Sequence, residues 1–312
     1  TLGSLLHHAT CGVHFFVVGD RDGWDALVEA ANGLPFAGTF VDLRLSDRYS
    51  RIVEQLPTTC PNMERHGTFR NLTEQKLFHA LAARVFLHEV LIGVQRVISL
   101  DIGDLVVLGD ICQLWSFFDW FNQHQIFAAA MEVGSQQVTY GPATGDDAAS
   151  FWSARGLQHT TKGINSGVLL LDIQRMATAD INGSTWTSTM LRSAHHVSRH
   201  WCGLAFFPDQ AMLSTFIFNA GEKYFYELSS RWNYIPGVHW EIAQHDAGAA
   251  GMPRNALKQK LHPGLRPGGR LVHACPSYVE LVGEWTLSLE VPAERTTWTA
   301  HVKDYFRWFN VF

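Results

Sequence analysis

Short apolar runs alternate with amphipathic stretches along most of the chain. Nearly continuous apolar runs and apolar–polar alternation predict strands at residues 13–18, 39–45, 97–100, 126–131, 168–171, 224–228 and 271–273. Apolar positions at helical spacing predict helices at residues 1–9, 24–31, 74–91, 173–177, 208–218 and 298–312. Residues 134–163 and 244–270 are rich in Gly, Ser, Thr, Asp or Pro and are predicted to be irregular connections. This alternation favours an α/β sheet flanked by helices.

Composition narrows the class of protein. The chain has 312 residues, of which 46% are hydrophobic and 17% charged, which supplies a large core and argues against disorder. The formal net charge of −5 argues against a nucleic-acid partner, because such proteins need a basic face to meet phosphates. It leaves room for a phosphate-bearing small molecule that is held through a metal. No apolar stretch reaches about 18 residues, so no membrane span is predicted.

The most informative segment is the run SLDIGDLVVLGDICQLW at residues 99–115. Asp101 and Asp104 follow directly after an apolar strand, and ligands of parallel α/β sheets bind at the carboxyl ends of strands. Hard cations such as Mn²⁺ and Mg²⁺ prefer carboxylate oxygens together with substrate phosphates. The pair therefore suggests a metal–diphosphate site, although two solvated turn residues beside Gly103 explain the same pattern.

Other candidates are weak when each is taken alone. Asn165-Ser166-Gly167 precedes an apolar run, and its glycine allows a close backbone approach to a ligand or simply forms a turn. Asp209 is either a helix N-cap or a carboxylate directed into a cleft. His273 ends a predicted strand, where a lone histidine is more often structural. Lys76 lies on a predicted helix, where most lysines are solvated.

The order of these motifs resembles glycosyltransferase family 8, whose members are retaining enzymes with a GT-A fold. The run LDIGDLVVLGDICQLW resembles the family's aspartate motif, and INSGVLLLD at residues 164–172 resembles its Asn-Ser-Gly strand. Asp209-Gln210, Trp232-Asn233 and His273 match the family's later motifs in order and approximate spacing. Residues 117–133 and 301–310 are most similar to LARGE-type xylosyltransferase domains and xyloside xylosyltransferases.

The resemblance implies a GT-A, Rossmann-like, mixed and mostly parallel sheet in a single domain at residues 1–312. It implies a UDP-sugar donor, with xylose as the preferred sugar and a hexose as the alternative, and a glycan or glycoprotein acceptor. The implied metal is Mn²⁺, or Mg²⁺, on Asp101, Asp104 and His273, where it acts as a Lewis acid on the departing diphosphate.

The remaining site residues also follow from the resemblance. The residues implied to contact the donor are Lys76, Asn165, Ser166, Gly167, Trp232 and Asn233. Asp209 and Gln210 are the implied catalytic pair, which stabilises an oxocarbenium-like transition state. No covalent nucleophile is assigned, although a carboxylate attacks more readily than an amide. The donor's own phosphate oxygen can accept the acceptor's proton, so no protein base is required.

Two features depart from the family pattern. The family usually has Asp-X-Asp, whereas this chain has Asp101-Ile-Gly-Asp104. Residues i and i+3 of a strand face opposite ways, so we predict a bulge at Ile102-Gly103 that brings both carboxylates to one ion. The family's first, nucleotide-binding strand is expected before Thr1, and any membrane anchor is expected further upstream.

Two alternative functions remain open at this point. An inactive relative that binds glycans or a partner fits the longer aspartate spacing, and a nucleotidyltransferase with a similar sheet fits the acidic site. A panel of UDP-sugars, with UDP release as the readout, distinguishes the first of these from an active transferase.

The predicted compartment is the lumen of the secretory pathway, in the Golgi or the endoplasmic reticulum. Five cysteines allow up to two disulfides and one free thiol, or five thiols. Two N-glycosylation acceptor patterns, at Asn71 and Asn182, favour a lumenal protein modestly.

Overall fold

The computed structural model describes only part of the chain in detail. The described residues are 2–19, 21–31, 34, 37–57, 81–101, 105–107, 109–131, 164–200, 208–229, 232–233 and 271–273. They form two compact units. Unit 1 comprises Thr1–Gly12, Leu100–Leu114 and Ser229–Phe312, and unit 2 comprises Val13–Ser99 and Trp115–Leu228. The predicted single domain of 1–312 stays a prediction.

Unit 1 contains a short strand pair and the N-terminal helix. Its elements are α1 (Leu2–His8), β4 (Leu105–Val107), the start of α6 (Ile111–Trp115) and β8 (Leu271–His273). Strands β4 and β8 are antiparallel. Helix α1 packs on β4, where the buried Ser4 hydroxyl accepts a hydrogen bond from the Val107 amide at 3.0 Å.

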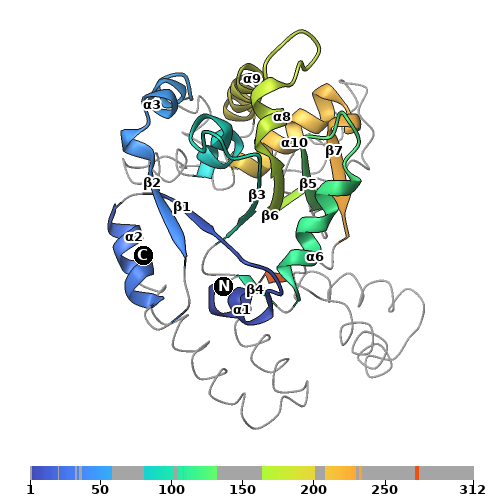
Figure 1. The fold of residues 1–312 in the computed structure, drawn as a ribbon. Coiled ribbons are helices and arrows are strands. Elements are labelled where there is room, and N and C mark those ends of the chain that lie inside the picture. Colours follow the sequence, from blue (N-terminus) through green and yellow to red (C-terminus); the bar gives the residue numbers. More distant parts are fainter. Residues whose placement is uncertain are drawn as a thin grey trace, which may run out of the picture. The chain divides into compact units, whose positions relative to one another are not determined.

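Unit 2 contains the main sheet, with the strand order β3-β6-β5-β7 (Figure 1). These strands are β3 (Arg96–Leu100), β5 (Phe127–Met131), β6 (Ile164–Asp172) and β7 (Phe225–Leu228). Strand β5 pairs antiparallel with β6 and parallel with β7, so the sheet is mixed, as expected. A second sheet pairs β1 (Phe15–Gly19) with β2 (Gly38–Asp42) in parallel.

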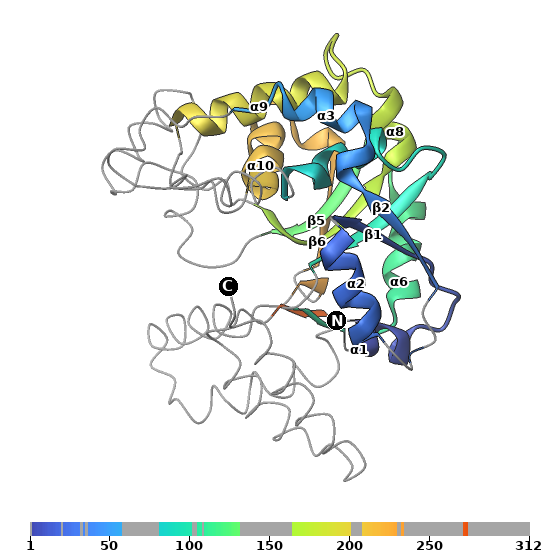
Figure 2. The same cartoon turned by 90° about the vertical axis from the view of Figure 1, so that its left-hand side faces the viewer.

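Helices and 3₁₀ turns complete unit 2. They are α2 (Arg21–Ala30), η1 (Leu43–Leu45), α3 (Asp47–Val53), η2 (Ala83–Glu89), η3 (Ser116–Trp120), α8 (Ile173–Thr178), α9 (Trp186–His200), α10 (Pro208–Ala220) and η6 (Glu222–Tyr224). Helices α9 and α10 pack against each other, and α10 also packs on β6 and η2 (Figure 2). None of the helices in the described ranges is long and apolar enough to cross a membrane.

The core of unit 2 explains which segments are strands and helices. Every residue of β6 is buried, which agrees with the apolar run at 168–171, but the buried residues also include the polar residues Asn165, Ser166 and Asp172. Every residue of α10 from Asp209 to Phe216 is also buried, and these include the polar residues Asp209, Gln210, Ser214 and Thr215. The indole nitrogen of Trp186 donates to the Val85 carbonyl at 2.7 Å, which anchors α9 to η2.

Three predicted elements differ in detail. The predicted strand at 39–45 ends at Asp42, whose carboxylate accepts from the Arg44 amide at 2.9 Å and starts a 3₁₀ turn. The predicted helix at 74–91 is described only from residue 81, and over Ala83–Glu89 it is a 3₁₀ helix with a kink at Phe86. The predicted helix at 298–312 lies outside the described residues.

One buried histidine belongs to this core. His88 is 6% exposed, and its Nε2 lies 2.8 Å from the Thr187 hydroxyl and 3.4 Å from a Glu89 carboxylate oxygen. Burial lowers the pKa of His88 to about 4, although the Glu89 charge opposes this shift. His88 is therefore neutral at physiological pH.

Candidate functional site

The Asn-Ser-Gly motif lies at a bulge in β6. Ala129 of β5 faces Leu169, whereas the next residue, Ala130, faces Asn165, so one step on β5 matches four steps on β6. The motif was predicted to precede the strand, but it lies within it. A bulge redirects side chains and leaves backbone groups without ladder partners, and such bulges are common beside active sites.

The unpaired backbone groups of this bulge find other partners. The Asn165 side-chain oxygen accepts from the Gly167 amide at 2.9 Å. The Gln210 side-chain oxygen accepts from the Ser166 amide at 3.1 Å, and the Ser166 hydroxyl lies 3.4 Å from the same oxygen. Because a buried amide without a partner costs about 1–3 kcal/mol, Asn165 and Gln210 are structural requirements of the bulge.

The N-terminus of α10 supplies the predicted catalytic pair. Pro208 is the first residue of this helix, a position where the missing amide hydrogen costs nothing. Asp209 and Gln210 follow in the first turn, and they are 1% and 6% exposed. A carboxylate in the first turn is favoured by the helix dipole. The helix therefore brings a buried carboxylate and a buried amide to the bulge.

Arg84 joins these two elements and was missed in the sequence. One of its guanidinium nitrogens, Nη1, donates to the Asp209 carboxylate at 2.9 Å and to the Ser166 carbonyl at 2.8 Å. The side chains of Arg84 and Asp209 are 13% and 2% exposed, so the pair is largely screened from solvent. Such a charge-assisted bond fixes the orientation of Asp209. The sequence signal was a lone arginine on the predicted helix at 74–91.

Unit 1 holds the predicted metal residues that the structure describes. Asp101 follows β3 and is half-buried. In the β4–β8 pair, Leu105 is the register partner of His273. Leu105 directly follows Asp104 in the sequence. The backbone of His273 therefore lies opposite the residue next to Asp104. Trp232 and Asn233 are 5% and 2% exposed in the same unit.

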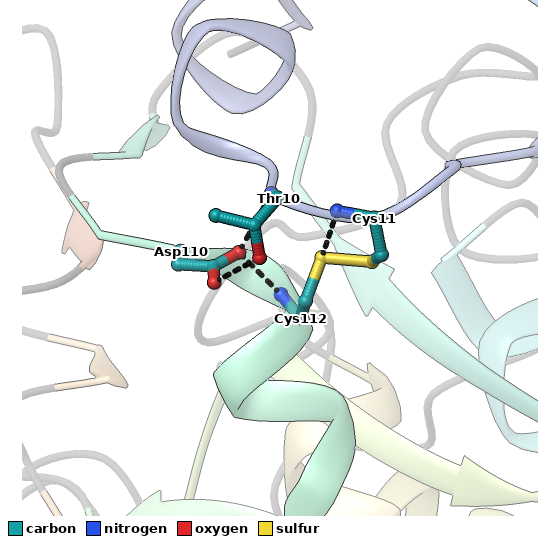
Figure 3. The surroundings of a disulfide bond; sticks show 4 residues. All are labelled: Thr10, Cys11, Asp110 and Cys112. Carbon is teal, nitrogen blue, oxygen red and sulfur yellow. Dashed lines mark hydrogen bonds between the residues drawn. A yellow bond between two sulfur atoms is a disulfide. The ribbon is translucent and has the colours of Figure 1, made fainter.

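A disulfide and an aspartate join two segments of unit 1. Cys11 and Cys112 are disulfide-bonded, which resolves one pair of the five cysteines (Figure 3). Asp110 accepts hydrogen bonds from the Thr10 amide at 3.2 Å, the Thr10 hydroxyl at 2.6 Å and the Cys112 amide at 2.9 Å. Its carboxylate thereby satisfies an amide at the start of α6 and holds the segment after α1.

The structure brings together only some of the predicted site residues. In unit 2 it joins Asn165, Ser166 and Gly167 to Asp209 and Gln210 through the contacts above. Lys76, Asp104, the Ile102-Gly103 bulge and the side chain of His273 lie outside the described residues. Within the described ranges no three His, Cys, Asp or Glu side chains gather. The three-residue metal site on Asp101, Asp104 and His273 stays a prediction.

Comparisons with known proteins bear on the fold and on the sequence. No protein-family model matches the chain. The crystal structure of mouse xyloside xylosyltransferase 1, in its apo form, superposes with a TM-score of 0.57 and 17% identity over 88% of this chain and 89% of that one. The chain has the GT-A glycosyltransferase fold.

Two curated proteins match the sequence of this GT-A chain. Glucoside xylosyltransferase 2 of Xenopus laevis is 27% identical over 172 residues, which cover 52% of this chain and 36% of that protein. Glucoside xylosyltransferase 1 of Rattus norvegicus is 26% identical over 174 residues, which cover 52% of this chain and 35% of that protein. The chain thus matches about a third of the length of these relatives.

Proposed function

We propose that the chain is a retaining, metal-dependent glycosyltransferase that moves a sugar from a UDP-sugar to a glycan or glycoprotein acceptor. The observation that carries this proposal is the buried cluster of Arg84, Asp209, Gln210 and the Asn-Ser-Gly bulge within a GT-A fold. The Ser166 carbonyl needs only a hydrogen-bond donor, so the backbone of the bulge does not explain why a carboxylate is buried beside Arg84, at a high desolvation cost.

Xylose is the proposed sugar. Its support is the similarity to proteins named glucoside xylosyltransferases. The buried groups of the cluster are amides, a hydroxyl and a carboxylate, which are suited to pairing with sugar hydroxyl groups. A site built from such groups discriminates against a sugar that leaves one of them unpaired, by about 1–3 kcal/mol per group.

The proposed chemistry on the transferred sugar belongs to the cluster in unit 2. In unit 2, Asp209 stabilises positive charge that develops on the sugar, and Arg84 and Gln210 hold Asp209 and the bulge in place. The acceptor hydroxyl attacks from the face that UDP leaves, and a phosphate oxygen of UDP accepts its proton. Anomeric configuration is thereby retained.

Asp101, Asp104 and His273 are the proposed ligands of Mn²⁺ or Mg²⁺ in unit 1. Two carboxylates and an imidazole are a suitable donor set for Mn²⁺, and the Leu105–His273 register supports the nearness of His273 to the aspartate motif. The ion supplies a Lewis acid that neutralises the diphosphate charge. The Cys11–Cys112 disulfide supports a secretory-pathway lumen, because disulfides persist in oxidising compartments.

A donor panel tests this proposal. The chain is incubated with UDP-xylose, UDP-glucose, UDP-galactose, UDP-N-acetylglucosamine and UDP-glucuronic acid, with and without Mn²⁺, and UDP release is measured. We expect release to be highest with UDP-xylose and to depend on the metal. Asp209→Asn removes the activity, whereas Asp25→Asn, a change at an exposed pair in α2, leaves it unchanged.

Two outcomes contradict parts of the proposal. A folded protein that releases no UDP from any donor is instead the glycan- or partner-binding relative. Binding of Mn²⁺ to Asp101→Asn and Asp104→Asn variants tests the metal site separately. If one of these variants binds the ion as tightly as the unchanged chain, then the two carboxylates do not share it.

A further inference from the structure

The turn between α8 and α9 contains a sequence motif that has no part in the proposed transfer reaction. Residues 182–184 read Asn-Gly-Ser, an acceptor pattern for N-linked glycosylation. The Ile181 amide donates to the Ser184 carbonyl at 2.8 Å, and the Ser184 amide donates back to the Ile181 carbonyl at 3.2 Å. These two bonds close a turn with Asn182 and Gly183 at its tip.

The backbone of this turn suits an asparagine at its first central position. Asn182 has a φ of 53° and Gly183 a φ of 80°, and two successive left-handed residues are typical of Asn-Gly turns. Ile181 is 2% exposed and anchors one side of the turn in the core. The Gly183 amide also donates to the Asp180 carboxylate at 2.6 Å. The position of Asn182 is therefore fixed by its neighbours and not by its own side chain.

Asn182 is accessible to an enzyme and has room for a glycan. Asn182 and Gly183 are exposed, and both views show the connection between α8 and α9 projecting beyond these helices (Figures 1 and 2). The Ser184 hydroxyl accepts only a surface contact, a hydrogen bond from the exposed Arg192 side chain at 3.0 Å. A glycan at this position displaces no packed residue.

The disulfide supplies an independent observation on the compartment. Cys11 and Cys112 are bonded in unit 1, and structural disulfides are formed in the oxidising compartments that also glycosylate proteins. We infer that Asn182 carries an N-linked glycan. This inference does not depend on the transferase activity of the chain.

The reaction needs a lipid-linked oligosaccharide as co-substrate. The side-chain nitrogen of Asn182 forms a bond to the anomeric carbon of the first sugar. The bond between that carbon and the lipid diphosphate breaks, the lipid diphosphate leaves with the electron pair, and the amide nitrogen gives one proton to a basic group of the transferring enzyme. Ser184 supplies the hydroxyl that the acceptor pattern requires.

Mass spectrometry of the secreted chain tests this inference directly. The chain is secreted from eukaryotic cells, digested, and treated with peptide N-glycosidase in H₂¹⁸O, with a sample that receives no glycosidase as the control for spontaneous deamidation. We expect residue 182 to be recovered as ¹⁸O-labelled aspartate only after glycosidase treatment. Recovery of unmodified Asn182 from the untreated secreted chain as its main form would overturn the inference.

Substitutions provide a second readout. Asn182→Asp keeps a residue that tolerates the left-handed backbone, and Ser184→Ala removes the hydroxyl; each is expected to abolish one glycosidase-sensitive mobility shift. Ser184→Thr and Arg192→Ala keep the acceptor pattern and are expected to retain the shift. Asn71→Gln identifies any shift that belongs to the other acceptor pattern. A shift that persists in both Asn182→Asp and Ser184→Ala contradicts a glycan at Asn182.

Discussion

Replacing Arg84 with methionine removes the guanidinium that pairs with Asp209. The two groups lie 2.9 Å apart, and their side chains are only 13% and 2% exposed. Methionine keeps much of the apolar stem of arginine but none of its donors. The Asp209 carboxylate and the Ser166 carbonyl then lose the bonds that Arg84 gave them.

The structure sets the size of the expected effect. Removing one partner of a buried ion pair costs about 3–5 kcal/mol. Asp209 lies in the first turn of α10, where the helix dipole stabilises a negative charge by about 0.3–1 kcal/mol and so offsets part of this cost. We therefore expect Arg84→Met to lower the free energy of unfolding by about 3 kcal/mol. Asp209→Asn is expected to cost about 2 kcal/mol, because the amide oxygen still accepts a hydrogen bond.

The double variant distinguishes the interaction between Arg84 and Asp209 from the loss of packing that each single replacement causes. With both Arg84→Met and Asp209→Asn, no unpaired charge remains buried, so the loss is expected to be about 1–2 kcal/mol smaller than the sum of the single losses. Urea unfolding followed by far-ultraviolet circular dichroism measures all three variants. Arg21→Met, in a pair whose side chains are 63% and 61% exposed, is the control and is expected to cost less than about 0.5 kcal/mol. Single losses that add to within about 0.5 kcal/mol would refute the reasoning.

Three further predictions concern His88, Gln210 and the disulfide. The pKa of His88 falls to about 4 on folding from an ordinary 6.5, so the unfolded chain binds more protons between these values and stability decreases as the pH is lowered. Lowering the pH from 7 to 5 is expected to cost about 2 kcal/mol in urea unfolding, and His88→Gln is expected to remove that part of the pH dependence. Gln210→Leu leaves the Ser166 amide without its acceptor and is expected to cost about 1–3 kcal/mol by the same measurement. The double replacement of Cys11 and Cys112 by serine opens a loop with a sequence separation of 101, so we expect a loss of about 2–5 kcal/mol, and an unchanged urea midpoint contradicts a stabilising bridge.

Most of the fold could be predicted from the sequence, because apolar runs indicate its strands and segments rich in Gly, Pro and small polar residues indicate its connections. The strands at 97–100, 126–131 and 168–171 lie in the main sheet, and the last two are buried along almost their whole length. In the strand at 97–100 only Val97 is buried. Helix α9 was missed, although Trp186, Met190 and Ala194 recur at helical spacing and are buried. The Thr, Ser and His residues among them weaken that signal.

The candidate site was predictable only where a motif marks it. Asp209, Gln210 and the Asn-Ser-Gly residues were found through a family resemblance, and the structure brings them together in unit 2. Arg84 was not found, because no local pattern shows that an arginine is directed into the core at a kinked 3₁₀ segment. Its role follows from tertiary packing of η2 against α10.

The bulge and the start of α10 are one structural unit, although they are 44 residues apart in the sequence. Ser166 has its amide bonded to Gln210 and its carbonyl bonded to Arg84, and Arg84 in turn holds Asp209. A change at any of these residues therefore leaves a buried polar group of another without its partner. Ser166 has no partner in the β5–β6 register, and its amide donates to the Gln210 side chain instead, so this interruption of the strand needs an acceptor at position 210. The motif pair is thus a requirement of the backbone before it is a requirement of any chemistry, and activity measurements on Gln210 variants are to be interpreted together with their stability.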